Sequence, residues 1–279
     1  MAPSKKYSRA YVEITNICNR SCSFCPGTKR ELRRMSEEEF AHVCEELLPF
    51  TDYIYFHVMG EPLTHPKLSD FIRFATKKGF KCAITTNGTL LDSLGDELIS
   101  SGVYKVSLSV HSFEEDNAQK QRAYLKTLAD FADKASRGGV LVVFRLWNRG
   151  CDEGRNDITL DFLKKRFAEV WSFGPRGARI RPKLHLEYGD RFDWPDIEAE
   201  EGSRGVFCYG LRDHFGILSD GRVIPCCLDR EGKITLGNVY EKPLSEILGA
   251  ERAKNIKEGF DRREAVEELC RKCGYARRF

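Results

Sequence analysis

The feature that most constrains the fold of this chain is a regular alternation of strand-like and helix-like segments over residues 8–188. Such alternation predicts βαβ units, which place their strands side by side in a parallel sheet. Six units predict an α/β fold with a partial (β/α)6, TIM-like barrel. The six β-rich segments are residues 10–15, 53–59, 81–88, 105–111, 139–147 and 178–187.

The helices between these strands have local signals of their own. Ser36 and Glu39 have the spacing of a capping box, which starts a helix in "SEEEFAHVCEELLPF". Gly79 follows the next helical stretch and predicts its end. Further helices are expected at 89–102, 118–137 and 157–170.

Several predicted strands carry polar residues, although parallel strands buried on both faces are nearly all apolar. Either these residues lie at strand ends or on a water-facing edge strand, or they line a polar lumen that holds a ligand. They are Thr85, Asn87, Ser107, Ser109, His111, Arg145, Arg179, Arg181, Lys183, His185 and Glu187. Sites in such barrels lie at the C-terminal ends of the strands. The side chains near those ends are His57, Asn87, His111 and Arg145.

The pattern changes after about residue 190. Residues 189–205 are polar and turn-rich, which predicts a linker between the barrel and a small C-terminal domain at 206–279. Asp220-Gly221 between two β-like runs predicts a hairpin, and a helix is expected from about Pro243. Because this tail is too small for a large core, a metal site is expected to stabilise it.

Composition excludes several classes of function. The net charge is +3, with 45 basic and 42 acidic residues intermixed, so no nucleic-acid role is expected. No apolar run approaches the roughly 18 residues of a membrane span, and no signal peptide is recognisable. We therefore expect a cytoplasmic protein. Its eleven cysteines then predict metal or redox use rather than disulfides.

The first cysteine group is Cys18, Cys22 and Cys25, spaced C-x3-C-x2-C. Three thiolates are one short of a closed structural zinc site. An iron–sulfur cluster suits a compact thiolate loop better, and three cysteines on a [4Fe–4S] cluster leave one iron open. The scattered Cys44, Cys82 and Cys151 are expected to be buried small hydrophobes or surface thiols.

The order of motifs resembles the radical SAM superfamily over residues 8–188. The C-x3-C-x2-C loop follows the first strand and has an aromatic residue, Phe24, before its last cysteine. "MGEPLTHP" (59–66) resembles the family's GEP-type motif, and "TTNG" (85–88) its third-strand motif. Ser109 and Arg145 fall where such enzymes contact the ribose and the carboxylate of the cofactor.

The resemblance implies how a cofactor would be held. Cys18, Cys22 and Cys25 would ligate a [4Fe–4S] cluster whose fourth iron binds S-adenosylmethionine. Reductive cleavage of the cofactor would give a 5′-deoxyadenosyl radical that removes hydrogen from a substrate. The implied contacts are the Gly60-Glu61-Pro62 backbone for the amino group, Phe24 for adenine, Ser109 for ribose, Arg145 for the carboxylate, and Asn87 of the third-strand motif. His65 resembles a common residue of the GEP-type motif, or caps the helix after Pro66.

The C-terminal cysteines resemble the SPASM/twitch extensions of that superfamily. The resemblance implies an auxiliary [4Fe–4S] cluster held by Cys208, Cys226, Cys270 and Cys273, and a zinc ribbon on the same thiolates is the alternative. Neighbouring residues of a strand point to opposite faces, so Cys227 is not expected to share the ligation of Cys226. Cys227 either acts catalytically as a hydrogen-atom donor or packs.

The expected function is oxidation of a small polyhydroxylated molecule or modification of a peptide, with the auxiliary cluster as an electron relay. The implied partners are that substrate and a reductase or flavodoxin-type electron donor. A redox-neutral epimerase and a non-catalytic, zinc-stabilised binding protein are the alternatives. If Arg179, Arg181 and Lys183 face inward, they favour an anionic or polyhydroxylated substrate.

Overall fold

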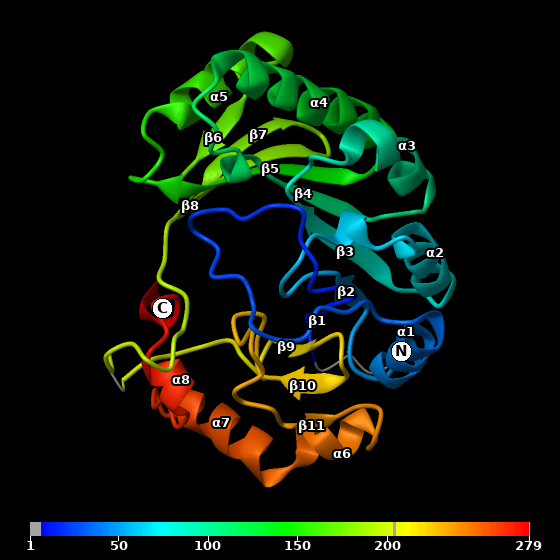
Figure 1. Ribbon diagram of the computed structural model, residues 1–279, viewed down its shortest axis with the longest axis vertical. Coiled ribbons are helices and arrows are strands. Elements are labelled where there is room, and N and C mark those ends of the chain that lie inside the picture. The colour runs from blue at the N-terminus through cyan, green and yellow to red at the C-terminus, as the bar shows by residue number, and fades with distance from the viewer. Residues whose placement is uncertain (1–6, 203–204, 279) are drawn as a thin grey trace.

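A computed structural model describes residues 7–202 and 205–278 and contains one curved sheet of eleven strands. Figure 1 shows this sheet as an arc with helices along its outer side, while the loop after the first strand crosses the hollow of the arc. The strand order is β11-β10-β9-β1-β2-β3-β4-β5-β8-β7-β6. In this part of the chain no helix is long and apolar enough to cross a membrane.

Six of the strands pair in parallel and form the partial (β/α)6 barrel that the sequence predicts. They are β1 (Arg9–Val12), β2 (Tyr53–Tyr55), β3 (Lys81–Thr86), β4 (Lys105–Ser109), β5 (Leu141–Arg149) and β8 (Leu184–Asp190). The helices between them are α1 (Glu37–Leu47), α2 (Leu68–Lys77), α3 (Leu91–Ser100), α4 (Ala118–Arg137) and α5 (Arg155–Arg166). The Ser36–Glu39 capping box is present at the start of α1.

The sixth β-rich segment differs from its prediction as a single strand. It is a hairpin of β7 (Gly177–Arg181) and β8, with Lys183 in the turn at a positive φ of 65°. Only β8 pairs in parallel with β5, and β7 continues antiparallel to β6 (Ser172–Gly174). The alternation of apolar residues correctly predicted extended backbone over residues 178–187. Alternation alone does not show where a strand reverses.

The expectation that Arg179, Arg181 and Lys183 contact a substrate inside the lumen is wrong, because none of the three lines the cavity. A register shift between Arg179 and Arg181 turns the Arg181 side chain outward. Its guanidinium donates to the Asp133 carboxylate (2.6 Å) and the Ser136 hydroxyl (2.9 Å) of α4, so it joins the hairpin to the outer helix layer.

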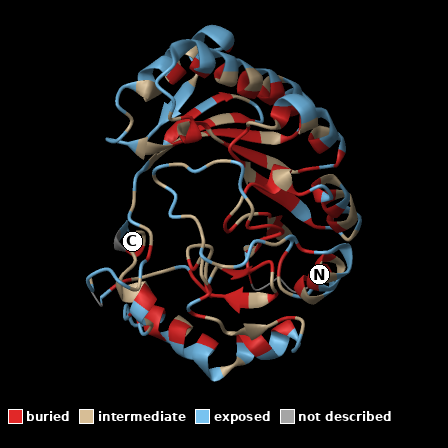
Figure 2. Ribbon diagram, viewed as in Figure 1, coloured by how far each residue is buried: buried red, intermediate tan, exposed pale blue. Residues whose placement is uncertain are grey.

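The apolar core lies between the sheet and its helices, as the band of buried residues in Figure 2 shows. Along β4, Val106 and Leu108 contribute to this core, while Ser109 lines the cavity of the barrel. Cys44 and Cys82 are fully buried and Cys151 is exposed, as expected of small hydrophobes and a surface thiol.

The C-terminal region extends the barrel sheet. β9 (His214–Ile217) pairs in parallel with β1, and β10 (Arg222–Ile224) folds back on β9 through the hairpin expected at Asp220-Gly221. β11 (Gly237–Asn238) completes the sheet, and the helices α6 (Leu244–Gly249), α7 (Glu251–Asp261) and α8 (Glu268–Arg271) follow. The second cysteine group thereby lines the same cavity as the first.

A buried carboxylate joins the segments around this hollow. Glu13, directly after β1, is fully buried and pairs with Arg30 of the cysteine loop at 2.6 Å. The same carboxylate accepts hydrogen bonds from the Met59 N–H (3.1 Å) and from the N–H and hydroxyl of Ser219 (3.2 and 2.9 Å). One side chain therefore holds three loops that are far apart in the sequence.

Replacing Glu13 by Gln should destabilise the protein strongly, because Arg30 is left buried without a counter-charge. We expect the free energy of unfolding to fall by about 3–5 kcal/mol, as for other broken buried ion pairs. Urea unfolding of the anaerobic protein, followed by circular dichroism, measures it. Glu246→Gln, which removes an exposed pair with Lys242, is the matched control and should change little. Equal effects of the two variants would contradict the role given to Glu13.

Candidate active site

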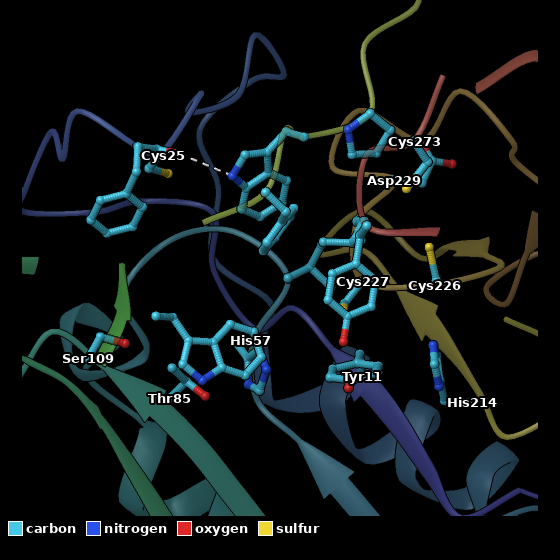
Figure 3. A pocket seen from close by; sticks show the side chains of 18 of the residues that line it. Tyr11, Cys25, His57, Thr85, Ser109, His214, Cys226, Cys227, Asp229 and Cys273 are labelled. Carbon is cyan, nitrogen blue, oxygen red and sulfur yellow. Dashed lines mark hydrogen bonds between the residues drawn. The ribbon is translucent and has the colours of Figure 1, made fainter. Parts of the chain in front are cut away.

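One cavity of about 740 Å³ occupies the hollow of the arc and is lined by residues from both parts of the chain. Figure 3 shows Cys25 and Ser109 on one side of it, Cys226 and Cys273 on the other, and Tyr11 and His57 near its base. The polar strand residues Thr85, Asn87, Ser109, His111 and Arg145 line it as well. The polar-lumen interpretation is therefore confirmed for these positions.

The first cysteine group lies on the loop that crosses the hollow. Cys18 and Cys25 are exposed and Cys22 is half-buried, and all three line the cavity. The loop is attached to the barrel because Asn87 donates from Nδ2 to the Asn19 side-chain oxygen (2.9 Å). Burial, followed by the charge of Glu114, raises the pKa of the Cys22 thiol to about 11.

The GEP-type segment is fixed by its own backbone and by one carboxylate. Gly60 has a positive φ of 80°, and a Cβ there would lie 2.5 Å from the Thr15 carbonyl oxygen, so only glycine fits. The buried Glu61 carboxylate accepts from the Asn87 N–H (2.7 Å) and the Leu63 N–H (3.1 Å). Burial raises the pKa of Glu61 to about 7 despite these bonds.

Two residues of this segment lie away from the cavity. Pro62 starts a short 3-10 helix, Pro62–Thr64, and is absent from the cavity wall as the structure describes it. His65 is buried; its Nδ1 accepts from the Lys67 N–H (3.1 Å) and its Nε2 lies 3.0 Å from the Met35 carbonyl oxygen. For His65 the structure therefore agrees with the helix-capping alternative.

Arg145 projects from β5 into the cavity. Its guanidinium lies 3.5 Å above the centre of the Trp147 ring, and its Nη1 is 3.5 Å from the Thr85 hydroxyl. The buried Nε has no hydrogen-bond partner among the described residues, so Arg145 keeps donor capacity for a ligand. Phe24 also lines the cavity, with its ring 4.9 Å from the His111 ring.

The second cysteine group lies on the C-terminal wall. Cys208, Cys226, Cys270 and Cys273 all line the cavity and are half-buried. Burial raises the pKa of Cys226 well above its usual value, and the other thiols of this wall raise it further. Burial likewise raises the pKa of Cys270 well above its usual value, and the thiols of Cys208 and Cys273 raise it further. The four thiols therefore share one wall of the cavity.

Cys227 faces a different part of the cavity from Cys226. It packs against Val58, Met59 and neighbouring apolar residues. Burial raises the pKa of its thiol to about 11, while hydrogen bonding to Tyr11 lowers it. This placement agrees with the expectation that Cys227 does not ligate the same cluster as Cys226.

Both groups are suited to iron–sulfur clusters. Within residues 7–202 and 205–278, no three Cys, His, Asp or Glu side chains are close enough together to hold a single metal ion. Each group instead brings three or four thiols to the wall of one cavity, and thiolates are the ligands that iron–sulfur clusters prefer. The residues present therefore fit two clusters.

Several residues of the cavity wall were missed by sequence reasoning. Arg9 and Tyr11 alternate with the buried Ala10 and Val12, so the alternation seen in other strands could have identified them. Trp194 gave no such signal. It belongs to the predicted linker, yet it lines the cavity and donates from Nε1 to the Phe24 carbonyl oxygen at 3.1 Å.

Comparison with known proteins gives two family matches. Residues 12–147 match the radical SAM superfamily, and residues 208–274 match the SPASM iron–sulfur cluster-binding domain. The chain also superposes on the crystal structure of BtrN in complex with AdoMet and 2-DOIA. That match has a TM-score of 0.63 at 19% identity, with 96% of this chain and 93% of BtrN covered, which shows a shared fold.

Two curated relatives extend over most of the chain. A tungsten-containing aldehyde ferredoxin oxidoreductase cofactor-modifying protein of Pyrococcus furiosus is 38% identical, covering 87% of this chain and 81% of the relative. An S-adenosyl-L-methionine-dependent 2-deoxy-scyllo-inosamine dehydrogenase of Niallia circulans is 30% identical, covering 96% and 93%. With its two thiol groups on one cavity, the chain belongs to the radical SAM superfamily and is an enzyme of that superfamily with a SPASM domain.

Proposed function

We propose that this enzyme oxidises a hydroxyl-bearing carbon of a small polyhydroxylated molecule to a carbonyl. The observation that carries this proposal is that both cysteine groups line the same cavity of about 740 Å³. Its wall offers hydroxyl, amide, imidazole and guanidinium groups that can bind hydroxylated ligands.

The residues that would hold the first cofactor lie together in this cavity. Cys18, Cys22 and Cys25 would ligate the first cluster. The backbone of Gly60 and Glu61, which line the cavity, would bind the amino group of S-adenosylmethionine, and Pro62 would fix the turn beside them. When bound, the cluster and cofactor supply a 5′-deoxyadenosyl radical that removes one hydrogen atom from the substrate. The neighbouring groups that we assign to this cofactor are Phe24 for adenine, Ser109 for ribose, Arg145 for the carboxylate, and Asn87, which orients the loop.

Completion of the oxidation requires the loss of one further electron and one proton from the substrate. Cys208, Cys226, Cys270 and Cys273 lie on the wall of the same cavity, where an auxiliary cluster can accept that electron. The electron then leaves the enzyme, and a reductase or flavodoxin-type protein is the partner that we propose for supply of electrons to the first cluster.

The relatives support a small substrate. The relative from Niallia circulans is named as a dehydrogenase of an inosamine, and its alignment with this chain covers 93% of its length. The name of the Pyrococcus furiosus relative describes modification of a cofactor. Peptide modification stays a second outcome, because a fold neighbour, SuiB, was crystallised with its precursor peptide.

A redox-neutral reaction is the second candidate, and Cys227 is the residue that favours it. Its thiol lines the same cavity and could return a hydrogen atom to the substrate. Against this stands its packing on Val58 and Met59, which gives the side chain a structural role. We therefore propose that Cys227 packs and that the net reaction is an oxidation.

The metal content tests the two-cluster assignment. Anaerobically purified protein should contain about eight iron and eight sulfide per chain, and Cys18/Cys22/Cys25→Ala should contain about four of each. Cys151→Ala, which removes an exposed thiol outside the cavity, is the control and should keep all eight. Zinc in place of iron, after expression with adequate iron, would contradict the assignment.

The product and its stoichiometry test the reaction. The assay contains S-adenosylmethionine, a reductant and aminocyclitols deuterated at the carbinol carbon. We expect one carbonyl product to form per 5′-deoxyadenosine, and the deuterium to be transferred to the 5′-deoxyadenosine. Cys226→Ala and Cys273→Ala should lower carbonyl formation at least tenfold more than 5′-deoxyadenosine formation, because they remove the electron acceptor. Cys227→Ala should retain most carbonyl product. An epimerised product that depends on Cys227, or turnover of peptides alone, would contradict the proposal.

A further inference from the structure

Oxidation of a carbinol carbon releases the proton of its hydroxyl group, so the cavity needs a residue that accepts this proton. Once the hydrogen atom on the carbon has been removed and the unpaired electron is lost, the remaining hydroxyl is a far stronger acid than an alcohol. The acceptor must touch that hydroxyl, carry no proton itself and keep a lone pair that no other group uses. Few groups of the cavity wall meet these three conditions.

The carboxylates of the wall are already engaged. Glu61 accepts from two backbone N–H groups, as described above, and Asp213 pairs with Arg9 at 2.8 Å. Asp229 accepts from two backbone N–H groups of its own loop, both at 2.8 Å. Protonation of any of these carboxylates would weaken contacts that hold the wall together, so none of them is suited to take the proton.

Three histidines line the cavity in the described part of the chain, and the surroundings of two argue against this role. His111 packs against Phe24, the ring assigned to adenine, with the two ring centres 4.9 Å apart. His214 begins β9 beside Asp213, with 3.8 Å between its Nδ1 and a carboxylate oxygen. The third histidine is His57.

Two aromatic neighbours fix the ring of His57, which lies two residues after β2. The Tyr11 ring meets it edge-on at 5.2 Å and 76°, and the Tyr55 ring lies 5.9 Å away. The Nδ1 of His57 is buried without a hydrogen-bond partner, and its Nε2 likewise has none among the described residues. Because the ring lines the cavity and Nδ1 is the buried nitrogen, Nε2 is the one open to a bound molecule. Such an unused nitrogen on a cavity wall points to a ligand.

The position of His57 suits a group that contacts the reacting carbon. Figure 3 shows it at the base of the cavity, with Ser109 to one side and Tyr11 and Cys226 to the other. In our proposal the hydrogen atom leaves the substrate on the side of Ser109, and the electron leaves on the side of Cys226. A molecule that reaches both sides lies over His57, whereas His214 lies beyond Tyr11.

The charge state of His57 also suits a proton acceptor. Burial, followed by the positive charges of Arg145, Lys105 and Arg9, lowers the pKa of His57 to about 3. The imidazole is therefore neutral at physiological pH and keeps an unshared electron pair. A weak base is sufficient here, because the hydroxyl becomes strongly acidic as the electron is lost. The same cations favour release of the proton to water afterwards.

We propose that His57 is the catalytic residue that accepts the hydroxyl proton of the substrate through its Nε2. In this step the O–H bond breaks and its proton moves to the imidazole. Of the three electrons held in that bond and on the carbon, two form the second bond of the carbonyl. The third passes to the auxiliary cluster, which is the oxidant. The inference rests on the proposed function for the substrate and for this oxidant.

Substitution of His57 by Gln separates proton transfer from binding, because an amide oxygen accepts a hydrogen bond but takes up no proton. In the assay with deuterated aminocyclitols, His57→Gln should form the carbonyl about 100-fold more slowly, with a far smaller loss of deuterium transfer to 5′-deoxyadenosine. It should keep about eight irons per chain, unlike Cys226→Ala. Calorimetry without reductant should show aminocyclitol binding within about threefold of the wild-type affinity.

Added imidazole tests whether a missing base is the cause. His57→Ala leaves space in the cavity, and imidazole should raise its carbonyl formation about tenfold or more, while Cys226→Ala should not respond. His185→Gln alters a histidine of β8 that does not line the cavity as the structure describes it, and it should oxidise the substrate at the wild-type rate.

The outcomes separate this inference from the proposed function. Full carbonyl formation by His57→Gln would overturn the inference and leave the proposed function intact. Equal losses of carbonyl and of deuterium transfer, without rescue by imidazole, would do the same. If the wild-type enzyme forms no carbonyl from any aminocyclitol, the proposed function fails and the inference fails with it.

Discussion

The arrangement of the site depends on the buried carboxylate of Glu13. It lies just beyond β1 and binds the cysteine loop through Arg30, the GEP-type segment through Met59 and the C-terminal hairpin through Ser219. A charged group in the core is costly unless it is paired and hydrogen-bonded throughout, and here all its partners come from segments that carry the chemistry. The same interaction that satisfies the charge therefore fixes the relative positions of the two thiol groups.

The second constraint is the continuity of the sheet. Because β9 pairs in parallel with β1, the C-terminal region continues the sheet of the barrel. The hairpin that follows directs Cys226 toward the hollow, and Trp194 closes the wall by its bond to Phe24. A cavity with a thiol group on each side suits a reaction that removes a hydrogen atom and then an electron from one bound molecule.

Much of this architecture could be predicted from the sequence. Strand–helix alternation predicted the six parallel strands, and the positions of Asn87, His111 and Arg145 at strand ends predicted a polar lumen. The reversal between β7 and β8 was missed, although Pro182 in its turn was a signal against one uninterrupted strand. The outward position of Arg181 depends on a register shift, and the pairing of β9 with β1 on contacts across some 200 residues. Neither the register shift nor the pairing of β9 with β1 produces a periodic pattern in the sequence.

The central claim is that both thiol groups hold clusters on one substrate cavity. Anomalous diffraction at the iron edge, from anaerobic crystals grown with S-adenosylmethionine, tests it most directly. The account predicts two four-iron peaks on the wall of one cavity, one bound by Cys18, Cys22 and Cys25 with the cofactor on the remaining iron, the other by Cys208, Cys226, Cys270 and Cys273. A single iron site, or clusters that open onto separate cavities, would contradict it.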